Sequence, residues 1–231
     1  MENNLRQQFN IGPHSIFNQI NILLTLETVW KNEKLCQALL PYKDQIMTQI
    51  MNIIESREKE LNTNPKKLDK ETLDILDLDL QRIKFYVKDY LRIRLAKIEK
   101  YLFHILKYNQ GDLLSENEMK FCAELVNMKA NYFNEGLKKL NVYVNNFRPF
   151  TDKFKTMSDK VSNLSESMIV KPNQNAYVLA ESISDDNIVI NVKDVYSEYT
   201  GDYVILSKGE AIMCPYELIK DSIINNKVKL L

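Results

Sequence analysis

"LDLQRIKFYVKDYLRIRLAKIEKYLFHIL", residues 78–106, predicts the central element of the fold. Its apolar residues recur at steps of three and four, which is the spacing of one face of an α-helix. The full stripe consists of Leu76, Leu80, Ile83, Val87, Leu91, Leu95, Ile98, Leu102 and Ile105. No Gly or Pro interrupts the chain from Leu68 to Gln110. At about 1.5 Å per residue, the pattern predicts one helix of roughly 60 Å around which the other elements pack.

Two helices are predicted before the long one. Helical spacing of apolar residues over 26–40 ends at Pro41. Asp44 is placed to cap a second helix, over 44–61. The preceding residues, 1–24, are rich in Asn and Gln and show only weak periodicity. We therefore expect them to form a mobile N-terminal arm.

One further helix is predicted after the long one. Gly111 is a natural terminator of the long helix. Ser115 and Glu118 then have the spacing of a capping box, which predicts a helix that runs to about residue 140. Residues 25–140 are therefore predicted to form a mostly antiparallel four-helix domain with one very long helix.

The character of the chain changes after residue 140. Residues 141–175 have no sustained period and are predicted to be a linker. Residues 176–231 contain short β-branched and apolar segments between polar turns, which predicts a small, mostly β domain. Gly209, in the sequence SKG, is predicted to supply the positive φ of a three-residue hairpin loop. The predicted fold class is therefore α+β.

The last five residues, KVKLL, alternate in polarity. Val228 and Leu230 share one face of a strand, and the two lysines share the other, because side chains alternate along a strand. We predict that Val228 and Leu230 are buried in the β domain. Leu231 is predicted to lie near a domain or subunit contact.

Composition narrows the classes of function. The 231 residues carry 31 basic and 31 acidic side chains, and this balance does not favour a bulk polyelectrolyte partner such as long duplex DNA. The three cysteines lack CxxC spacing, which predicts a reducing compartment. The longest uncharged stretch, 7–26, is too polar to span a bilayer. With only five glycines, the chain also has no Gly-rich phosphate loop.

The residues that could carry catalysis or bind a metal are scattered. A metal site needs clustered ligands, whereas His14 and His104 are far apart in the sequence. His104 is interpreted as a packed or helix-terminal histidine. Asp74, Asp77 and Asp79 lie in the first part of the long helix, where the helix dipole favours acids, and are interpreted as a solvated face. The sequence therefore predicts no enzymatic activity, no metal and no cofactor.

The basic half of the long helix allows two interpretations. Its cations are Arg82, Lys84, Lys88, Arg92, Arg94, Lys97, Lys100 and Lys107. Only Asp89 and Glu99 oppose them between residues 81 and 107. The cations either complement the C-terminal half of the helix and meet an acidic neighbour, or contact phosphates. The second interpretation describes a basic helical DNA-binding protein that acts alone.

The apolar residues of the same helix favour a protein partner. Phe85, Tyr86, Ile93 and Phe103 fall off the main stripe, so the helix has more apolar surface than three short companions can cover. Exposed apolar surface of that size on a soluble protein marks an interface. We therefore expect a subunit whose helices complete a core with another chain.

The sequence also resembles a known family. TVWKNEKLCQALLP, residues 28–41, and the long-helix sequence are similar to the Sld-five type of subunit of the eukaryotic GINS complex. YLRIRLAKIEK, residues 90–100, is the specific part, and the similarity extends in order over about 26–231. The residues that carry it are Trp30, Asn32, Glu33, Lys34, Arg82, Ile83, Tyr90, Leu91, Arg92, Arg94, Leu95, Lys97, Ile98, Glu99 and Lys100.

This resemblance implies a structural role without catalysis. GINS is a heterotetramer of four related chains that joins the MCM ring and a RecJ-like cofactor in the replicative helicase. The resemblance thus implies three GINS partners, the MCM ring, the RecJ-like cofactor and the replicative polymerase. It also implies a nuclear location, weak or indirect DNA contact and no membrane. The expected partner-interface residues are Trp30, Arg82, Tyr90, Arg92, Arg94, Lys97, Val228, Leu230 and Leu231.

Overall fold

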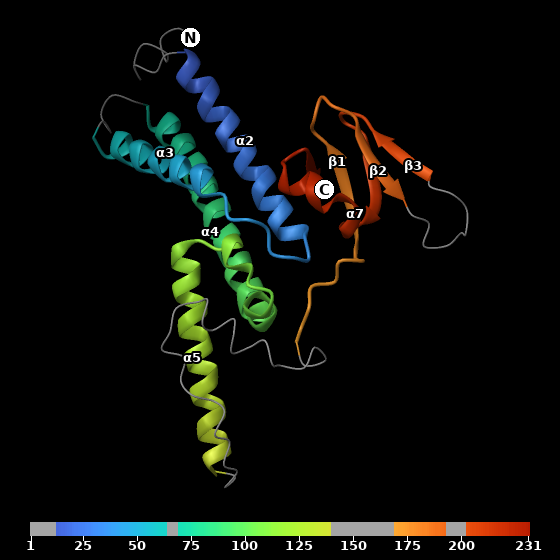
Figure 1. Cartoon of the computed structure of the whole chain (residues 1–231). Helices are drawn as coiled ribbons and strands as arrows, with labels where there is room; N and C mark the ends of the chain where they lie inside the picture. The colour runs from blue at the N-terminus through green and yellow to red at the C-terminus, as the bar shows by residue number, and fades with distance from the viewer. Residues whose placement is uncertain (1–12, 64–68, 140–168, 193–201) are drawn as a thin grey trace.

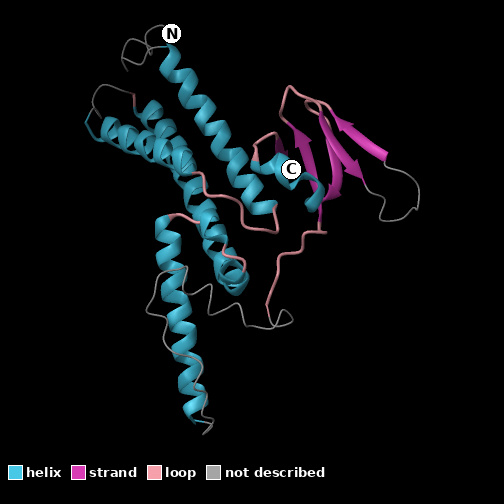
Figure 2. Cartoon of the chain, in the orientation of Figure 1, coloured by secondary structure: helices cyan, strands magenta, loops and turns pink. Residues whose placement is uncertain are grey.

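The structure is a computed structural model that describes residues 13–63, 69–139, 169–192 and 202–231. Helices occupy the first two ranges, and a small β part with one helix occupies the last two (Figures 1 and 2). The α+β class predicted from the sequence is confirmed. The helical part contains α2 (Pro13–Leu35), α3 (Asp44–Thr63), α4 (Lys70–Lys107), the 3₁₀ turn η1 (Gln110–Leu113) and α5 (Glu116–Lys139).

The first helix begins earlier than its sequence pattern indicates. α2 starts at Pro13, so residues 13–24 of the predicted arm are helical, which corrects that prediction. Residues 1–12 lie outside the described residues. Proline suits the first helical position, because the N–H that it lacks would have no partner in the first turn. Ile22 and Leu23 pack against the core between α2, α3 and α4, a tertiary contact that weak periodicity does not reveal.

α2 also ends earlier than predicted, at Leu35. The ammonium group of Lys97, on α4, donates hydrogen bonds to the backbone carbonyl of Glu33 and, at 2.9 Å, to that of Ala38. A cation that binds the last carbonyls of a helix stabilises the helix end. Residues 36–43 therefore form a non-helical connection to α3 instead of another turn of α2.

α4 has the predicted length but is kinked at Tyr101, where the backbone is not helical, and its buried face differs in one place from the predicted stripe. Between Val87 and Ile98, two pairs of residues have the spacing of a buried helical face. One pair is Leu91 and Leu95, and the other is Tyr90 and Arg94. The structure buries Tyr90 and Arg94, whereas Leu95 of the predicted stripe is 37% exposed. Arg94 faces inward because the helical part supplies acidic partners there, which no apolar pattern can indicate.

The predicted capping box opens α5. The N–H of Ser115 donates to Oε2 of Glu118 at 2.9 Å, and the N–H of Glu118 donates to Oγ of Ser115 at 3.3 Å. Two backbone donors at the start of α5 are thereby satisfied. The same bonds fix the Glu118 side chain near the start of the helix.

The direction of α5 departs from the predicted antiparallel arrangement. α2 and α4 run one way and α3 the other, but α5 runs in the same direction as α4 (Figure 1). Glu118 pairs with Arg94, and further along both helices Lys129 lies over the ring of Phe103. The reason is that η1 returns the chain to the middle of α4, where Nη2 of Arg94 donates to the Leu113 carbonyl at 2.8 Å.

Two apolar clusters hold the helical part together. One lies between α2, α3 and the first half of α4 and contains Leu26, Val29, Met47, Ile50, Ile54, Leu80, Ile83, Val87 and Tyr90. The other joins the last part of α4 to α5 and includes Ile98, Tyr101, Leu102, Ile105, Leu106, Cys122, Leu125, Val126 and Ala130. Full burial of one such aliphatic side chain stabilises the fold by about 1.5–3 kcal/mol.

The described β part contains two small antiparallel sheets. Its elements are β1 (Tyr177–Ser182), β2 (Ile188–Val192), β3 (Asp202–Leu206), β4 (Ala211–Pro215), α7 (Tyr216–Ile224) and β5 (Val228–Leu230). β1 is the central strand of one sheet, in the order β4-β1-β5, and β2 pairs with β3 in the other. The predicted strands and the short helix are therefore present, with pairing that the sequence did not indicate.

The SKG turn connects the two sheets. Gly209 has the predicted positive φ, 81°. However, β3 pairs with β2 and β4 pairs with β1, so the predicted hairpin between β3 and β4 is wrong. The end of β1 binds the turn instead: the N–H of Gly209 donates to the Ser182 carbonyl at 2.8 Å, and the N–H of Ser182 donates to the Glu210 carbonyl at 3.0 Å.

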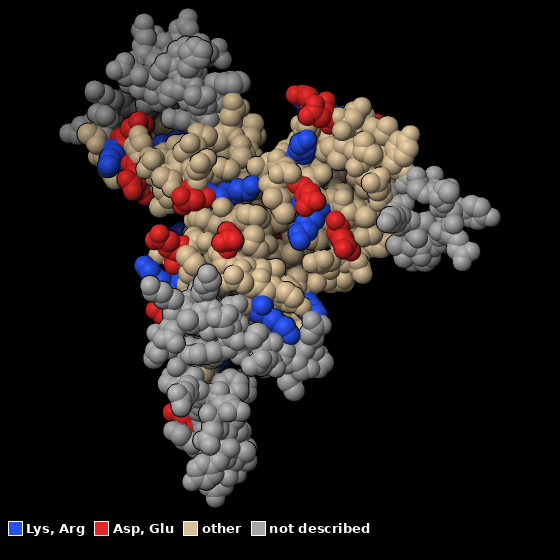
Figure 3. Space-filling model, in the orientation of Figure 1, with Lys and Arg blue, Asp and Glu red and all other residues tan. Residues whose placement is uncertain are grey.

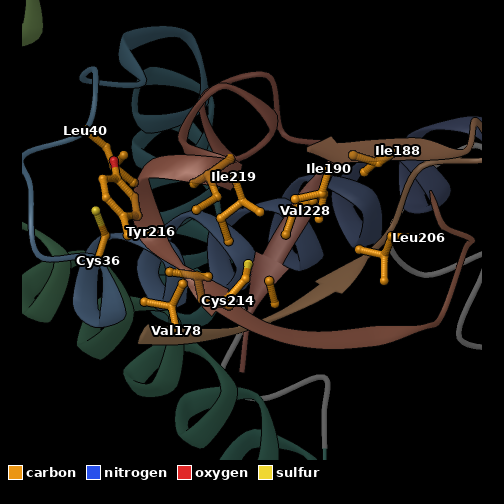
Figure 4. Packing of buried hydrophobic residues seen from close by; sticks show 13 residues of the cluster. Cys36, Leu40, Val178, Ile188, Ile190, Leu206, Cys214, Tyr216, Ile219 and Val228 are labelled. Carbon is orange, nitrogen blue, oxygen red and sulfur yellow. The ribbon is translucent and has the colours of Figure 1, made fainter. Parts of the chain in front are cut away.

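The core of the β part includes two residues from the connection after α2. Cys36 and Leu40 lie beside Tyr216 of α7 (Figure 4). The other buried members are Val178, Ala180, Ile188, Ile190, Leu206, Cys214, Ile219, Ile223, Val228 and Leu230. The range 176–231 thus contains the helix α7 as well as strands, and its core includes two residues of the predicted domain 25–140. Most of the predicted linker 141–175 lies outside the described residues.

Candidate protein-interaction site

Arg94 lies fully buried at the centre of the helical part. Its Nε and Nη2 donate to the two carboxylate oxygens of Glu118, at 2.7 and 3.0 Å. Nη1 donates to Oε2 of Glu33 at 3.1 Å and to the Leu40 carbonyl at 2.6 Å, and Nη2 also donates to the Leu113 carbonyl. All the N–H groups of the guanidinium are therefore used. A buried charge is tolerated when it is paired and hydrogen-bonded in this way.

The surroundings of Arg94 keep it charged. Burial by itself lowers the pKa of Arg94, but the hydrogen bond to Glu118 and the negative charge of Glu33 outweigh burial and raise the pKa above its ordinary value. The rings of Tyr42 and Tyr90 lie 5.3 and 5.6 Å from the guanidinium carbon, which adds cation–π attraction. Arg94 thus holds α2, the connection after it, η1 and α5 around α4.

Both acidic partners of Arg94 accept a hydrogen bond from a second donor. Oε1 of Glu33 accepts a hydrogen bond from the ammonium group of Lys97 at 2.8 Å. Oε2 of Glu118 accepts from the N–H of Ser115 as well as from Arg94. The capping box therefore orients the carboxylate that pairs with Arg94. We call Glu33, Arg94, Lys97 and Glu118 the buried ion network.

Trp30 joins α2 to α4 on the flank of this network. Its indole N–H donates to Oδ2 of Asp89 at 2.7 Å, and its ring lies 4.9 Å from that of Tyr86. Lys34 lies 3.6 Å from the same Asp89 oxygen and 4.7 Å from the indole ring. These bonds are within the chain, so part-buried Trp30 serves the packing of α2 on α4.

The structure places several of the predicted interface residues inside the chain. Tyr90, Arg94, Val228 and Leu230 are at most 1% exposed. The predicted burial of Val228 and Leu230 in the β part is confirmed. The bonds of Arg94 correct the expectation that it pairs across subunits, because its acidic partners belong to its own chain. Lys97 is also bound within the chain.

The other predicted interface residues face outward. Arg82 and Arg92 are exposed on α4. Leu231 is 48% exposed at the end of the β part. The predicted set is therefore not a single surface, and its outward members lie on two separate elements.

The face of α4 that points away from its buried side is partly apolar. Leu78, Phe85 and Leu95 are 63%, 55% and 37% exposed, and Lys88 and Arg92 lie among them. Spacings of seven residues place Leu78, Phe85 and Arg92 in one row and Lys88 and Leu95 in the next. We call these five residues the outer face of α4.

Among the described residues, α2 and α3 leave the outer face of α4 uncovered. α2 meets α4 at Asp89 on one flank, and α3 meets it on the other, where Lys84 pairs with Glu58 at 2.7 Å. Tyr86 and Phe103, which also fall off the predicted stripe, pack within the chain. The predicted apolar excess is therefore smaller than the sequence implies, and Phe85 is its main member.

A second apolar surface lies on the β4-β1-β5 sheet. Tyr177, Leu179, Met213 and Leu231 are between 43% and 68% exposed. Leu179 lies opposite Met213 in the strand register, and its carbonyl accepts the N–H of Leu231 at 3.0 Å. These four residues form the outer sheet face.

Several cations of the long helix are paired with acids of the same chain. Arg94 and Lys97 turn inward, and Lys84 pairs with Glu58, so these cations of the basic helix are engaged by the chain's own acids. Basic and acidic residues are interspersed on the face shown in Figure 3. Among its described residues, that face lacks the basic stripe that is typical of a nucleic-acid-binding surface.

Within the described ranges, no group of three or more His, Cys, Asp or Glu side chains is placed to hold a metal ion. The three cysteines are buried and free. Burial raises the pKa of Cys122 to about 12, so little of this thiol is present as the nucleophilic thiolate. Half-buried His104 contacts Tyr108 with tilted rings, whose centroids are 4.7 Å apart. Among the same described helices, none combines the length and apolar content of a membrane span.

A cavity of about 350 Å³ lies between the helical part and the β part. Its walls include Leu39, His104, Ile105, Tyr216 and Lys220. The side chains that line it include no Ser, Thr or Cys, so the cavity has no hydroxyl or thiol nucleophile apart from the buried phenols of its tyrosines. The two exposed apolar surfaces, the outer face of α4 and the outer sheet face, are of the kind that marks contacts between proteins.

Three polar residues have roles that sequence reasoning did not assign. Asn32 and Glu33 were noted only as part of the family resemblance, and Glu118 only as a capping residue. In the structure, Glu33 and Glu118 pair with Arg94, and Asn32 binds β5. An inward-facing cation on a helix predicts that acids elsewhere in the chain face it, but the apolar pattern did not show that Arg94 faces inward.

The fold defines a class of protein, a helical bundle around one long helix that is followed by a small β part. A family model, Sld5, described as the helical bundle domain of GINS complex proteins, matches residues 31–137. The matched range includes the whole buried ion network. The helical part of the chain, residues 31–137, matches the Sld5 family of GINS complex proteins, and the resemblance seen in the sequence is confirmed.

Whole-chain relatives extend the match into the β part. The DNA replication complex GINS protein SLD5 of Yarrowia lipolytica is 29% identical over 220 residues, which cover 91% of this chain and 78% of the relative. The protein of the same name from Arabidopsis thaliana is 23% identical over 209 residues, 89% of each chain. The one from Homo sapiens is 25% identical over 224 residues, 94% of this chain and 92% of the relative.

Proposed function

We propose that the protein is a non-catalytic, structural subunit of the GINS complex and acts in the initiation and elongation of DNA replication. The relatives are named as DNA replication complex GINS proteins, and the proposal extends that assembly to this chain. Its partners are three other GINS subunits and, through the complex, the MCM ring, the RecJ-like cofactor and the replicative polymerase. Its site of action is the nucleus.

The observation that carries this proposal is the outer face of α4. Phe85 is 55% exposed and Leu78 is 63% exposed on a helix whose opposite side is packed against α2 and α3. A helix that is apolar on two sides needs a second partner to bury the second side. A helix of another subunit lying along this face supplies that burial.

Charge adds a preference for the partner. Lys88 and Arg92 are exposed among the apolar residues of the outer face. Complementary charge steers association and fixes register more than it adds affinity. The partner helix is therefore proposed to be amphipathic, with acidic residues beside its apolar row.

The alternative is a basic DNA-binding protein that acts alone. The inward orientation of Arg94 and Lys97 argues against it, because their N–H groups bind the chain's own acids and carbonyls. A DNA-binding chain loses affinity steeply with added salt, in proportion to its phosphate contacts. Salt-dependent binding of fork DNA by the isolated chain would support the alternative.

The test is co-expression with the three other GINS subunits of the same organism, followed by native mass measurement. We expect one complex with a single copy of each subunit. Phe85→Glu should dissociate the chain from that complex, whereas Met51→Glu, at an exposed position on α3, should not. A chain that remains a well-behaved monomer in the presence of all three subunits would contradict the proposal.

A further inference from the structure

The last turn of α2 binds the final strand of the β part through one buried amide. Asn32 is 2% exposed. Its Nδ2 donates to the Val228 carbonyl at 3.1 Å, and its Oδ1 accepts the N–H of Leu230 at 2.7 Å. Both backbone groups belong to β5. One side chain of the helical part thus makes two hydrogen bonds to a strand almost two hundred positions away, with separations of 196 and 198.

These two bonds lie on the open edge of β5. On the other side β5 pairs with β1: Lys229 is opposite Glu181, and the N–H of Leu231 donates to the Leu179 carbonyl. Backbone groups alternate between the two sides of a strand, so those of Val228 point away from β1. The carboxamide of Asn32 therefore occupies the position of one peptide group of a neighbouring strand. An unpaired strand edge is otherwise open to pairing with another chain.

Further contacts cross between the parts near the same place. The ammonium group of Lys43 donates to the Ile224 carbonyl, at the end of α7, at 3.1 Å. Cys36 and Leu40, which follow α2, are 3% and 8% exposed and pack in the β core beside Tyr216 (Figure 4). Polar and apolar contacts therefore hold the β part at the end of α2.

Glu33, the residue after Asn32, is bound by α4. Glu33 is 1% exposed and pairs with Arg94 and Lys97 on α4. Because Asn32 and Glu33 are adjacent on one helical turn, their positions are coupled through the backbone. The end of α2 is thus fixed to α4 on one side and to β5 on the other.

We propose that the last turn of α2 is an interdomain latch, in which Asn32 replaces a missing strand beside β5 and holds the β part in one orientation on the helical part. Asn32 is a positioning residue: it sets where the outer sheet face lies relative to the outer face of α4. The latch is internal to the chain, so the orientation does not depend on a partner subunit. The inference is independent of the proposed function.

The latch requires a side chain that both donates and accepts, and the amide of Asn32 does so through two separate atoms. Val228 supplies an acceptor and Leu230 a donor, and only a group with both functions satisfies the two. Asp at position 32 would face the Val228 carbonyl with a second acceptor, and Ala would leave both backbone groups without their partner. Asn32→Ala and Asn32→Asp are therefore both expected to open the latch.

The first measurement is hydrogen exchange of the Leu230 amide in the full chain, free or in its assembly. Asn32→Ala should accelerate this exchange about tenfold or more, since an unmade buried hydrogen bond costs about 1–3 kcal/mol and about 1.4 kcal/mol is tenfold. Amides of α4 around Ile98 should keep their protection. Asn52→Ala, at an exposed position on α3, is the matched control and should change neither.

The second measurement is the distance distribution between spin labels at Thr48 and Asp186, which are exposed on the helical and β parts. We expect one narrow distribution for the wild type and for Asn52→Ala, and a broadened one for Asn32→Ala. An Asn32→Ala chain that keeps both slow Leu230 exchange and the narrow distribution would overturn the latch. If that variant does not fold, Lys43→Ala decides: a broadened distribution supports the latch, and an unchanged one overturns it.

Discussion

Glu118 binds Arg94 with both carboxylate oxygens, at 2.7 and 3.0 Å, between two helices that run in the same direction. Both side chains are almost inaccessible to solvent, at 0% and 5% exposure. The pair is therefore not an ordinary surface ion pair, which contributes only about 0–1 kcal/mol. The pair attaches α5 to α4. Because both groups are buried, removing one of them leaves the other as an uncompensated charge inside the protein.

Removing the guanidinium of Arg94 should strongly destabilise the helical part. Arg94→Ala leaves Glu118 buried without its cation and Glu33 with Lys97 alone, and breaking a buried ion pair typically costs about 3–5 kcal/mol. Urea denaturation should show this loss in the free energy of unfolding. Arg92→Ala, two residues away on the exposed side, should change stability by no more than about 0.5 kcal/mol. Equal unfolding midpoints for the two variants would contradict the structural role of Arg94.

Charge reversal on the outer face of α4 should weaken assembly without unfolding the chain. Arg92→Glu places a negative charge opposite the acidic partner helix that we propose, so the association rate should fall and its salt dependence should change. Stopped-flow mixing with the other GINS subunits measures this rate. Gln49→Glu, an exposed position on α3, is the control. An association rate for Arg92→Glu equal to that of the control would count against the proposed face.

Deletion of residues 227–231 should open more than the β part. The sequence alone leads us to expect that a truncated chain loses the β domain and keeps an intact helical domain. In the structure the deletion also removes the partners of Asn32 and uncovers Cys36 and Leu40. Tryptic digestion of the assembled complex should therefore cut at Lys34 as well as in the β part. Unchanged resistance of both regions would show that β5 is dispensable.

The stability of the fold should fall as the pH rises above about 9. Burial, with a smaller effect from Glu118, raises the pKa of the Cys122 thiol from 9.0 to about 12. Between these values the unfolded chain has released the proton and the folded chain still holds it, so the folded state binds more protons. Stability therefore decreases with pH, by at most about 1.4 kcal/mol per unit for this one group. The free energy of unfolding is expected to fall between pH 9 and pH 12.

The comparison for this pH effect is Cys122→Ala, which has no thiol to titrate. Unfolding midpoints of the two proteins, measured at steps from pH 8 to pH 11, should converge as the pH rises, because only the wild type loses stability through this thiol. Parallel midpoints over the whole range would contradict the assignment. Below about pH 8 the difference between the two proteins should stay constant.

Local patterns in the sequence determined the elements of this protein. The apolar period around Leu80 and Ile98 predicts α4, and the spacing of Ser115 and Glu118 predicts the start of α5. The alternation at Val228 and Leu230 predicts their burial. These features depend on hydrogen bonds and side-chain periods within a few residues, so they can be read along the chain.

The tertiary structure alone decided which segments meet. It turned Arg94 inward in place of Leu95, ran α5 parallel to α4, and made Asn32 the edge partner of β5. Each of these depends on a partner distant in sequence, such as Glu118 or Val228, whose position no local pattern contains. A buried polar side chain is stable only where such a partner satisfies it, and the fold as a whole brings the two together.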